Sequence, residues 1–210
     1  RTLTGLSMSI LIGVLAAGVS AVMALILGIC AATLGKKVDS AISFAIDTVM
    51  GIPHILLLIL ISYAMGKGLK GVIAGVALTH WTSLARLIRG EVMQLRESEY
   101  IQIAGKLGLG KWEIAKKHIV PHVLPQFIVG LVLLFPHAIL HESSITFLGF
   151  GLSTEQPAIG VILSESMRYL IMGKWWLAVF PGMMLVLTVV LFEKGGTALR
   201  QLLDPGSVHK

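Results

Sequence analysis

Long apolar runs separated by short polar segments form the main pattern of this chain. The first run covers residues 6–34 without a charged residue, and it ends at Gly35, Lys36 and Lys37. A bilayer-spanning helix needs roughly 20 apolar residues, so this run predicts a membrane span. Small residues recur along it at the spacing that lets a second helix approach closely. These small residues are Gly13, Ala17, Ser20, Ala24 and Gly28.

Four further apolar segments predict four more spans, over residues 41–65, 69–88, 121–150 and 175–192. The segment 151–174 is too polar and too broken to cross a bilayer simply, and we expect a turn and a short helix there. Three of the spans carry polar residues or proline within the apolar run. These are Asp47, Pro53 and His54 in the second span, His80 in the third, and His137, His141 and Glu142 in the fourth.

Between the third and fourth spans lies a long segment, residues 91–125, that is rich in both signs of charge. Around Gly108 and Gly110 it predicts a helix, a turn and a second short helix. Residues 111–118 can form two helical turns that place Trp112, Ala115 and Ile119 on one face. A short amphipathic helix of this kind fits a groove in a partner protein. Alternatively, it lies on lipid headgroups, as basic amphipathic helices do.

Composition supports a membrane protein. Of the 210 residues, 55% are hydrophobic and only 13% are charged, which is too apolar for a soluble domain. The single cysteine, Cys30, lies inside an apolar run, so neither a disulfide framework nor a cysteine metal site is available. We therefore predict one transmembrane domain over residues 1–210, an all-α polytopic helical bundle with about five spans.

The distribution of lysine and arginine predicts the orientation. If residues 91–120 are cytoplasmic, alternation of the spans puts 12 of the 17 basic residues inside. The five that fall outside are Arg1, Lys67, Lys70, Arg168 and Lys174. An excess of basic residues on the cytoplasmic side is the bias seen in membrane proteins. The net charge of +6 is therefore attributed to cytoplasmic loops, and no nucleic-acid partner is expected.

Ionisable residues within spans indicate a pathway, because a charged group at the bilayer centre costs about 2.5 kcal/mol or more. His137 and His141 are four residues apart and share one helical face. Imidazole is a common ligand for nickel-like ions. Candidate residues for a translocation path or metal station are His137, His141, Glu142, His80 and His54. Alternatively, each histidine makes an interhelical hydrogen bond, worth under about 1 kcal/mol, and touches no substrate.

An intramembrane metalloenzyme is a less favoured alternative. Zinc proteases use two histidines at this spacing, with a glutamate directly after the first as general base. Here Ala138 occupies that position, and Glu142 follows the second histidine instead. The sequence also has no phosphate-binding GxxxxGK[ST] loop, so energy for transport would come from another protein. Neither an enzyme nor a passive channel would need the charged segment 91–120 as a docking loop.

Residues 99–108 (EYIQIAGKLG) and 118–121 (HIVP) resemble the EAA loop of ABC importer permeases. Gly108 and Pro121 keep their places in that pattern, while Gln102 stands at its acidic position. The segments RLIR (86–89), SITFLGFG (144–151) and LDP (203–205) are similar to the second, C-type permease subunit of dipeptide, oligopeptide and nickel importers.

The resemblance implies a type I permease bundle and a transport subunit rather than an enzyme. The histidines favour the nickel-type branch, with nickel or another transition metal, free or chelated, as cargo; dipeptide or oligopeptide import is the alternative. Family members usually carry one more N-terminal span, so we expect one upstream of Arg1. The coupling residues expected to face an ATPase are Gln102, Ala104, Gly108, Lys111, Trp112, Glu113, Ala115 and Lys116.

The same resemblance implies the other parts of the transporter. We expect a homologous second permease that forms a heterodimer with this chain in the inner membrane of a prokaryote. Two cytoplasmic subunits would bind and hydrolyse ATP, and an extracytoplasmic binding protein would deliver the substrate. The chain itself is expected to carry no cofactor.

Overall fold

The computed structural model describes residues 1–203, without the side chain of Lys111, and all regular elements in this part are helices. The LDP segment extends beyond the described residues at Asp204 and Pro205. The helices are α1 (Thr2–Thr33), α2 (Lys36–Gly51), α3 (His54–Ala64), α4 (Gly68–Glu97), α5 (Glu99–Lys106), α6 (Lys111–Ile114), α7 (Val120–Phe147), α8 (Ile159–Leu170) and α9 (Trp176–Leu203), with a π-helical turn at Ala115–Ile119 between α6 and α7.

Helix α1 packs along α4 and α7 through its small residues. Gly13, Ala17, Ser20, Ala24 and Gly28 are all buried, as their spacing predicted. A Cβ atom added at Gly28 would lie 2.8 Å from the carbonyl oxygen of Ala85 on α4, and one at Gly13 would lie 3.0 Å from the ring of Phe135 on α7. These contacts bring the helix backbones close together, which is the general basis of association between apolar helices in lipid.

The second expected span is sharply bent. It consists of α2 and α3, which meet at an angle of 101°. Ile52 is extended at the break, with φ −92° and ψ 137°, because the proline that follows disfavours helical backbone at this position. Pro53 also lacks an N–H group, so it cannot continue the hydrogen bonds of α2. The bend directs His54, the first residue of α3, toward the bundle.

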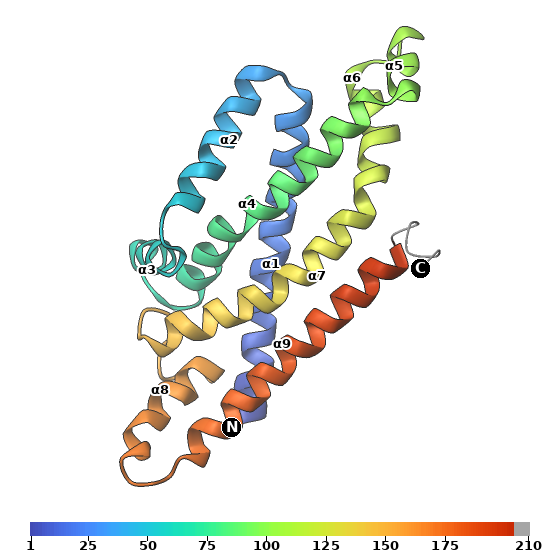
Figure 1. The fold of residues 1–210 in the computed structure, drawn as a ribbon. Coiled ribbons are helices and arrows are strands. Elements are labelled where there is room, and N and C mark those ends of the chain that lie inside the picture. Colours follow the sequence, from blue (N-terminus) through green and yellow to red (C-terminus); the bar gives the residue numbers. More distant parts are fainter. Residues whose placement is uncertain (204–210) are drawn as a thin grey trace.

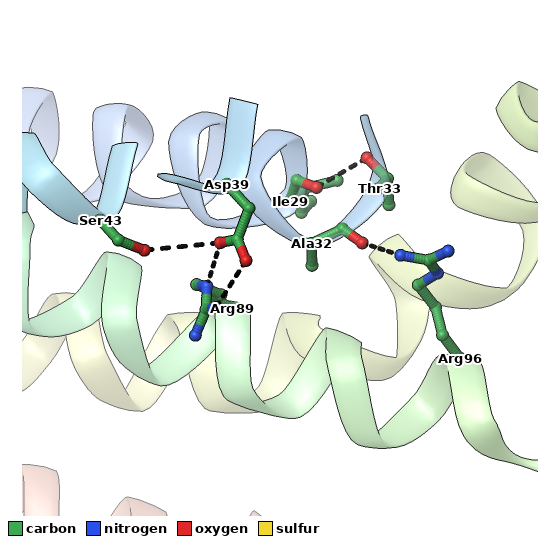
Figure 2. Close-up of polar contacts among 7 residues, drawn as sticks. All are labelled: Ile29, Ala32, Thr33, Asp39, Ser43, Arg89 and Arg96. Carbon is green, nitrogen blue, oxygen red and sulfur yellow. Dashed lines mark hydrogen bonds and ion pairs between the residues drawn. The ribbon is translucent and has the colours of Figure 1, made fainter. Parts of the chain in front are cut away.

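Polar contacts join α1, α2 and α4 near one end of the bundle (Figure 2). The guanidinium group of Arg89 donates to both carboxylate oxygens of Asp39, at 2.5 and 2.7 Å. A second pair, Arg86 to Asp47 at 2.6 Å, also connects α4 to α2. Arg96 donates to the carbonyl of Ala32 in the last turn of α1, where helix carbonyls have no partner within the helix.

The fourth span is longer than its apolar core. Residues Trp112–Phe147 form one continuous rod that contains α6, the π-helical turn and α7. The π-helical turn ends two residues before Pro121, whose ring would clash with the carbonyl of Lys117 in a regular α-helix. The wider π-helical turn, which contains Lys117, relieves this clash.

The remaining elements complete the predicted topology. Figure 1 shows α5 and α6 at one end of the bundle and α8, the short helix expected in segment 151–174, at the other. Within residues 1–203, four helices are long and apolar enough to cross a membrane, and the number of spans is five if the bent pair α2 and α3 counts as one. Large apolar side chains on α1 and α9 are exposed, which fits contact with lipid. The prediction of an all-helical bundle with about five spans is confirmed.

Candidate functional site

Three histidines from three helices converge inside the bundle. His54 begins α3, His80 lies in the middle of α4, and His141 lies near the end of α7. One ring nitrogen from each lies within 4.8 Å of those from the other two. The ring centroids are 4.5 to 4.9 Å apart. We call this group the histidine trio.

Hydrogen bonds hold two of the three rings. Nδ1 of His80 lies 2.9 Å from the carbonyl oxygen of Val76, and Nδ1 of His141 lies 2.8 Å from that of His137. A carbonyl oxygen only accepts, so each Nδ1 carries the hydrogen in these contacts and the lone pair of the neutral ring resides on Nε2. Nε2 of His80 lies 3.1 Å from Nδ1 of His141. Nε2 of His54 is buried and has no hydrogen-bond partner.

The trio lies in the wall of a cavity of about 790 Å³ between α2, α3, α4 and α7. Thr79, Thr82 and Ser83 add hydroxyl groups to the wall, and the remaining lining is mostly aliphatic. Ligand cavities commonly enclose about 300–1,000 Å³ and combine an apolar wall with a few polar groups. This cavity is therefore the candidate site for substrate, and the histidines are its nitrogen donors.

The other two candidate residues of the fourth span have different surroundings. His137 also lines the cavity, but its ring is exposed and is not part of the trio. Glu142 is fully buried on another side of α7, where Ser143 and Thr146 donate to its carboxylate at 3.2 and 3.0 Å. Ser9 of α1 hydrogen-bonds to the same carboxylate. Glu142 thus joins helices. His137 and His141 both line the cavity, as a shared helical face predicts, and the ring of His141 also meets those of His54 and His80.

The charged segment forms the expected helix, turn and short helix. Gly108 adopts a φ of +90°, which is unfavourable for any residue with a side chain, so this glycine sets the turn after α5. Around the turn, large apolar side chains are exposed at the end of the bundle. They are Tyr100, Ile103, Leu107 and Trp112, with Leu107 and Trp112 about four-fifths exposed. We call these four residues the apolar end patch.

The expected coupling residues do not all reach this surface. Gln102 and Lys116 are exposed, and Glu113 pairs with Lys117 at 2.6 Å. Ala104 lies on the buried face of α5, and the side chain of Lys111 lies outside the described part. Ala115 is half-buried.

One detail of the expected helix face is wrong. Trp112 is exposed but Ile119 is 2% exposed, so the two residues do not share one accessible face. The π-helical turn between them widens the helix and changes the spacing of its side chains. Three residues of the apolar end patch, Tyr100, Ile103 and Leu107, were not among the expected coupling residues. Their signal in the sequence is a large apolar side chain in an otherwise charged segment.

Comparison with known proteins identifies the family. Residues 24–207 match the model of the "Binding-protein-dependent transport system inner membrane component" family. The dipeptide permease DppC of Bacillus subtilis (strain 168) is 32% identical over 98% of this chain and 64% of its own length. DppC of Alkalihalophilus pseudofirmus is 34% identical over 98% of this chain and 67% of its own length, and the oligopeptide permease OppC of B. subtilis is 32% identical over the same shares. The chain thus spans about two thirds of the length of these relatives.

Solved structures show the same fold. A crystal form of the MetNI methionine ABC transporter, in an inward-facing conformation, contains a chain that superimposes with a TM-score of 0.77. It is 16% identical and the match covers 96% of this chain and 95% of that one. An amino acid ABC transporter crystallised with histidines gives a TM-score of 0.69 at 18% identity, over 95% and 92% of the two chains. The fold is that of ABC importer permeases, and the chain belongs to their dipeptide and oligopeptide family.

Proposed function

We propose that this chain is a permease subunit of an ATP-driven importer and forms half of a path for dipeptides or short oligopeptides. The sequence relatives carry this proposal, because three of them are named for dipeptide or oligopeptide transport and each matches 98% of the chain. The cavity of about 790 Å³ has room for a short peptide, and its hydroxyl and imidazole groups can hydrogen-bond to a peptide backbone.

The proposed partners follow from the family. A second permease completes the path, and a binding protein delivers the peptide to the side where α8 lies. ATPase subunits dock at the opposite end, against the apolar end patch. An exposed apolar patch beside charged residues is typical of a protein-binding surface. Helix α5 directly follows α4, and α6 is part of the rod Trp112–Phe147. Because α4 and α7 line the cavity, movement of the docked subunit would be transmitted to the cavity wall.

Transition-metal import, with nickel as the example, is the second candidate. The histidine trio favours it, because three imidazoles in a cavity wall suit a nickel-like ion. The named relatives favour peptides, so we place metal import second.

Uptake by the reconstituted transporter tests this order. The full-length chain would be combined with its partner permease, ATPases and binding protein in proteoliposomes, and uptake of a labelled dipeptide and of ⁶³Ni²⁺ would be measured side by side. We expect ATP-dependent dipeptide uptake. Uptake of nickel without dipeptide uptake would reverse the order of the two candidates, and uptake of neither would contradict both.

A further inference from the structure

We propose that His54, His80 and His141 together bind one divalent transition-metal ion in the wall of the cavity. The proposal rests on the proposed function only in taking the cavity as the transport path. The proposal concerns binding of the ion by the three histidines. It applies to a bare transported ion, to a transported ion chelated by a peptide, and to a permanently bound ion that connects three helices.

The donor atoms are already arranged for an ion. Metal–nitrogen bonds of about 2.1 Å place neighbouring ligand nitrogens about 3–3.4 Å apart. Nε2 of His80 lies 3.1 Å from Nδ1 of His141, and no distance within the chosen set of nitrogens exceeds 4.8 Å. Without an ion, Nδ1 of His141 carries a hydrogen and donates to the His137 carbonyl, so coordination through this atom requires that hydrogen to move to Nε2 of the same ring. If the longest of these nitrogen–nitrogen distances shortens by about 1.5 Å, all three nitrogens can bond to one ion, and a small side-chain rotation can supply this shift.

His54 supplies the strongest reason to expect a ligand. Its Nε2 atom is buried without a hydrogen-bond partner, and an unsatisfied buried polar atom is costly. Coordination to a metal ion would satisfy this nitrogen. No hydrogen bond to that atom would be lost when His54 moves inward.

His80 shows the support usual for a metal ligand. Ligand histidines commonly donate the second ring N–H to a carbonyl or carboxylate, which fixes the ring and raises the basicity of the other nitrogen. Nδ1 of His80 contacts the Val76 carbonyl at 2.9 Å and the Thr79 hydroxyl at 3.0 Å, and its Nε2 faces His141. The ring is thus oriented before any ion arrives.

The chemistry of the site defines the class of ion. Three neutral imidazoles suit Ni²⁺, Cu²⁺ or Zn²⁺, whereas Mg²⁺ and Ca²⁺ prefer oxygen ligands. Among the described residues the carboxylate nearest in sequence, Glu142, is engaged by Ser143 and Thr146 and does not line the cavity. The remaining coordination positions would therefore face the cavity, open to water or to the amino and carbonyl groups of a peptide.

Equilibrium dialysis of the purified full complex tests the proposal, with Ni²⁺ alone in one arm and Ni²⁺ with glycylglycine in the other. We expect one saturable ion per chain in at least one arm, and Mg²⁺ should not compete. Binding of labelled dipeptide in equal amount with Ni²⁺ would show that the chelated ion is the form held. Binding in the first arm alone would show that the bare ion is held.

Variants identify the ligands. His54→Ala, His80→Ala and His141→Ala should each weaken binding at least tenfold, while His122→Ala, an exposed histidine near the start of α7, should leave it unchanged. His54→Cys should retain Zn²⁺ binding, because a thiolate is a good zinc ligand; a histidine with only a structural role would show no such rescue. Gel filtration of the complex confirms assembly of each variant.

Three results would overturn the proposal. The first is that neither arm shows saturable Ni²⁺ binding. The second is that wild type and the triple alanine variant bind Ni²⁺ equally. The third is that binding requires His137 but not His54. Dipeptide uptake by the same preparations is a separate readout. If dipeptide uptake persists while metal binding is absent, the metal site is refuted and the proposed import function stands. If metal binding is present while dipeptide uptake is absent, peptide import is refuted and the metal site stands.

Discussion

Arg89 of α4 donates to both carboxylate oxygens of Asp39 on α2, at 2.5 and 2.7 Å, and both side chains are only about one quarter exposed. Ser43 lies 3.4 Å from the same carboxylate. Bidentate contacts of this kind fix the relative orientation of the two groups as well as their distance. The pair therefore holds the first half of the bent span against α4, the helix that carries His80.

Asp39→Asn should loosen α2 from α4. The amide has one acceptor oxygen, so one of the two hydrogen bonds from Arg89 and the attraction between opposite charges would be lost. We expect a loss of about 1 kcal/mol, since the pair is partly exposed. Thermal unfolding of the purified complex would measure it. The matched control is Asp47→Asn, whose pair with Arg86 is more than half exposed on both sides. An equal effect of both substitutions would show that the bidentate pair has no special role.

Gly28→Ala should destabilise the contact between α1 and α4. The new Cβ atom would meet the backbone oxygen of Ala85 at 2.8 Å, and the helices would have to move apart, at a cost of about 1–3 kcal/mol. Gly18→Ala is the control, because no atom lies within 4 Å of a Cβ added there. Denaturation in detergent should separate the two variants, and equal stability would contradict the close packing of α1 on α4.

Gly108→Ala should impair the turn after α5 through backbone strain alone. Open space surrounds this glycine, but its φ of +90° is unfavourable for alanine. Gly110→Ala introduces the same methyl group two residues later, where space is also open and φ is not positive. We expect substrate-stimulated ATP hydrolysis to fall several-fold in the first variant and to stay near wild type in the second. The opposite order would contradict a role for the turn in coupling.

Trp112→Ala should weaken binding of the ATPase subunits, because Trp112 is 80% exposed and its loss has little reason to affect the fold. A tryptophan that becomes buried at the centre of a protein interface commonly contributes about 2 kcal/mol or more, which is roughly a 30-fold change in affinity. Co-purification and substrate-stimulated ATP hydrolysis would both report the change. Val22→Ala on α1 is the control, since it removes an exposed apolar side chain far along the chain from the patch. Normal assembly and coupling in Trp112→Ala would contradict docking at the apolar end patch.

The orientation can be tested with single cysteines in a Cys30→Ala background. Lys116→Cys and Glu155→Cys both place the thiol at exposed positions, at the two ends of the bundle. An impermeant maleimide added to intact cells should label Glu155→Cys only, and Lys116→Cys should react after the membrane is permeabilised. Labelling in the reverse pattern would invert the topology and remove the basis for the coupling role.

The sequence by itself determined the class of fold. Apolar runs such as residues 6–34 must be helical in lipid, because only a helix or a closed barrel satisfies the backbone there. Small residues such as Gly28 predicted the close packing of α1, and Gly108 predicted the turn in the charged segment. These features depend on composition and on local backbone geometry, which a single segment contains.

Only the tertiary structure decided which histidines meet. Spacing along one helix pairs His137 with His141, since residues four apart share a face. The trio instead takes His141 together with His54 and His80, which are 61 residues or more away in sequence. The 101° bend at Pro53 and the packing of α4 on α7 bring them together. The sequence shows that a bend is possible there, but its direction depends on contacts between segments far apart in the chain.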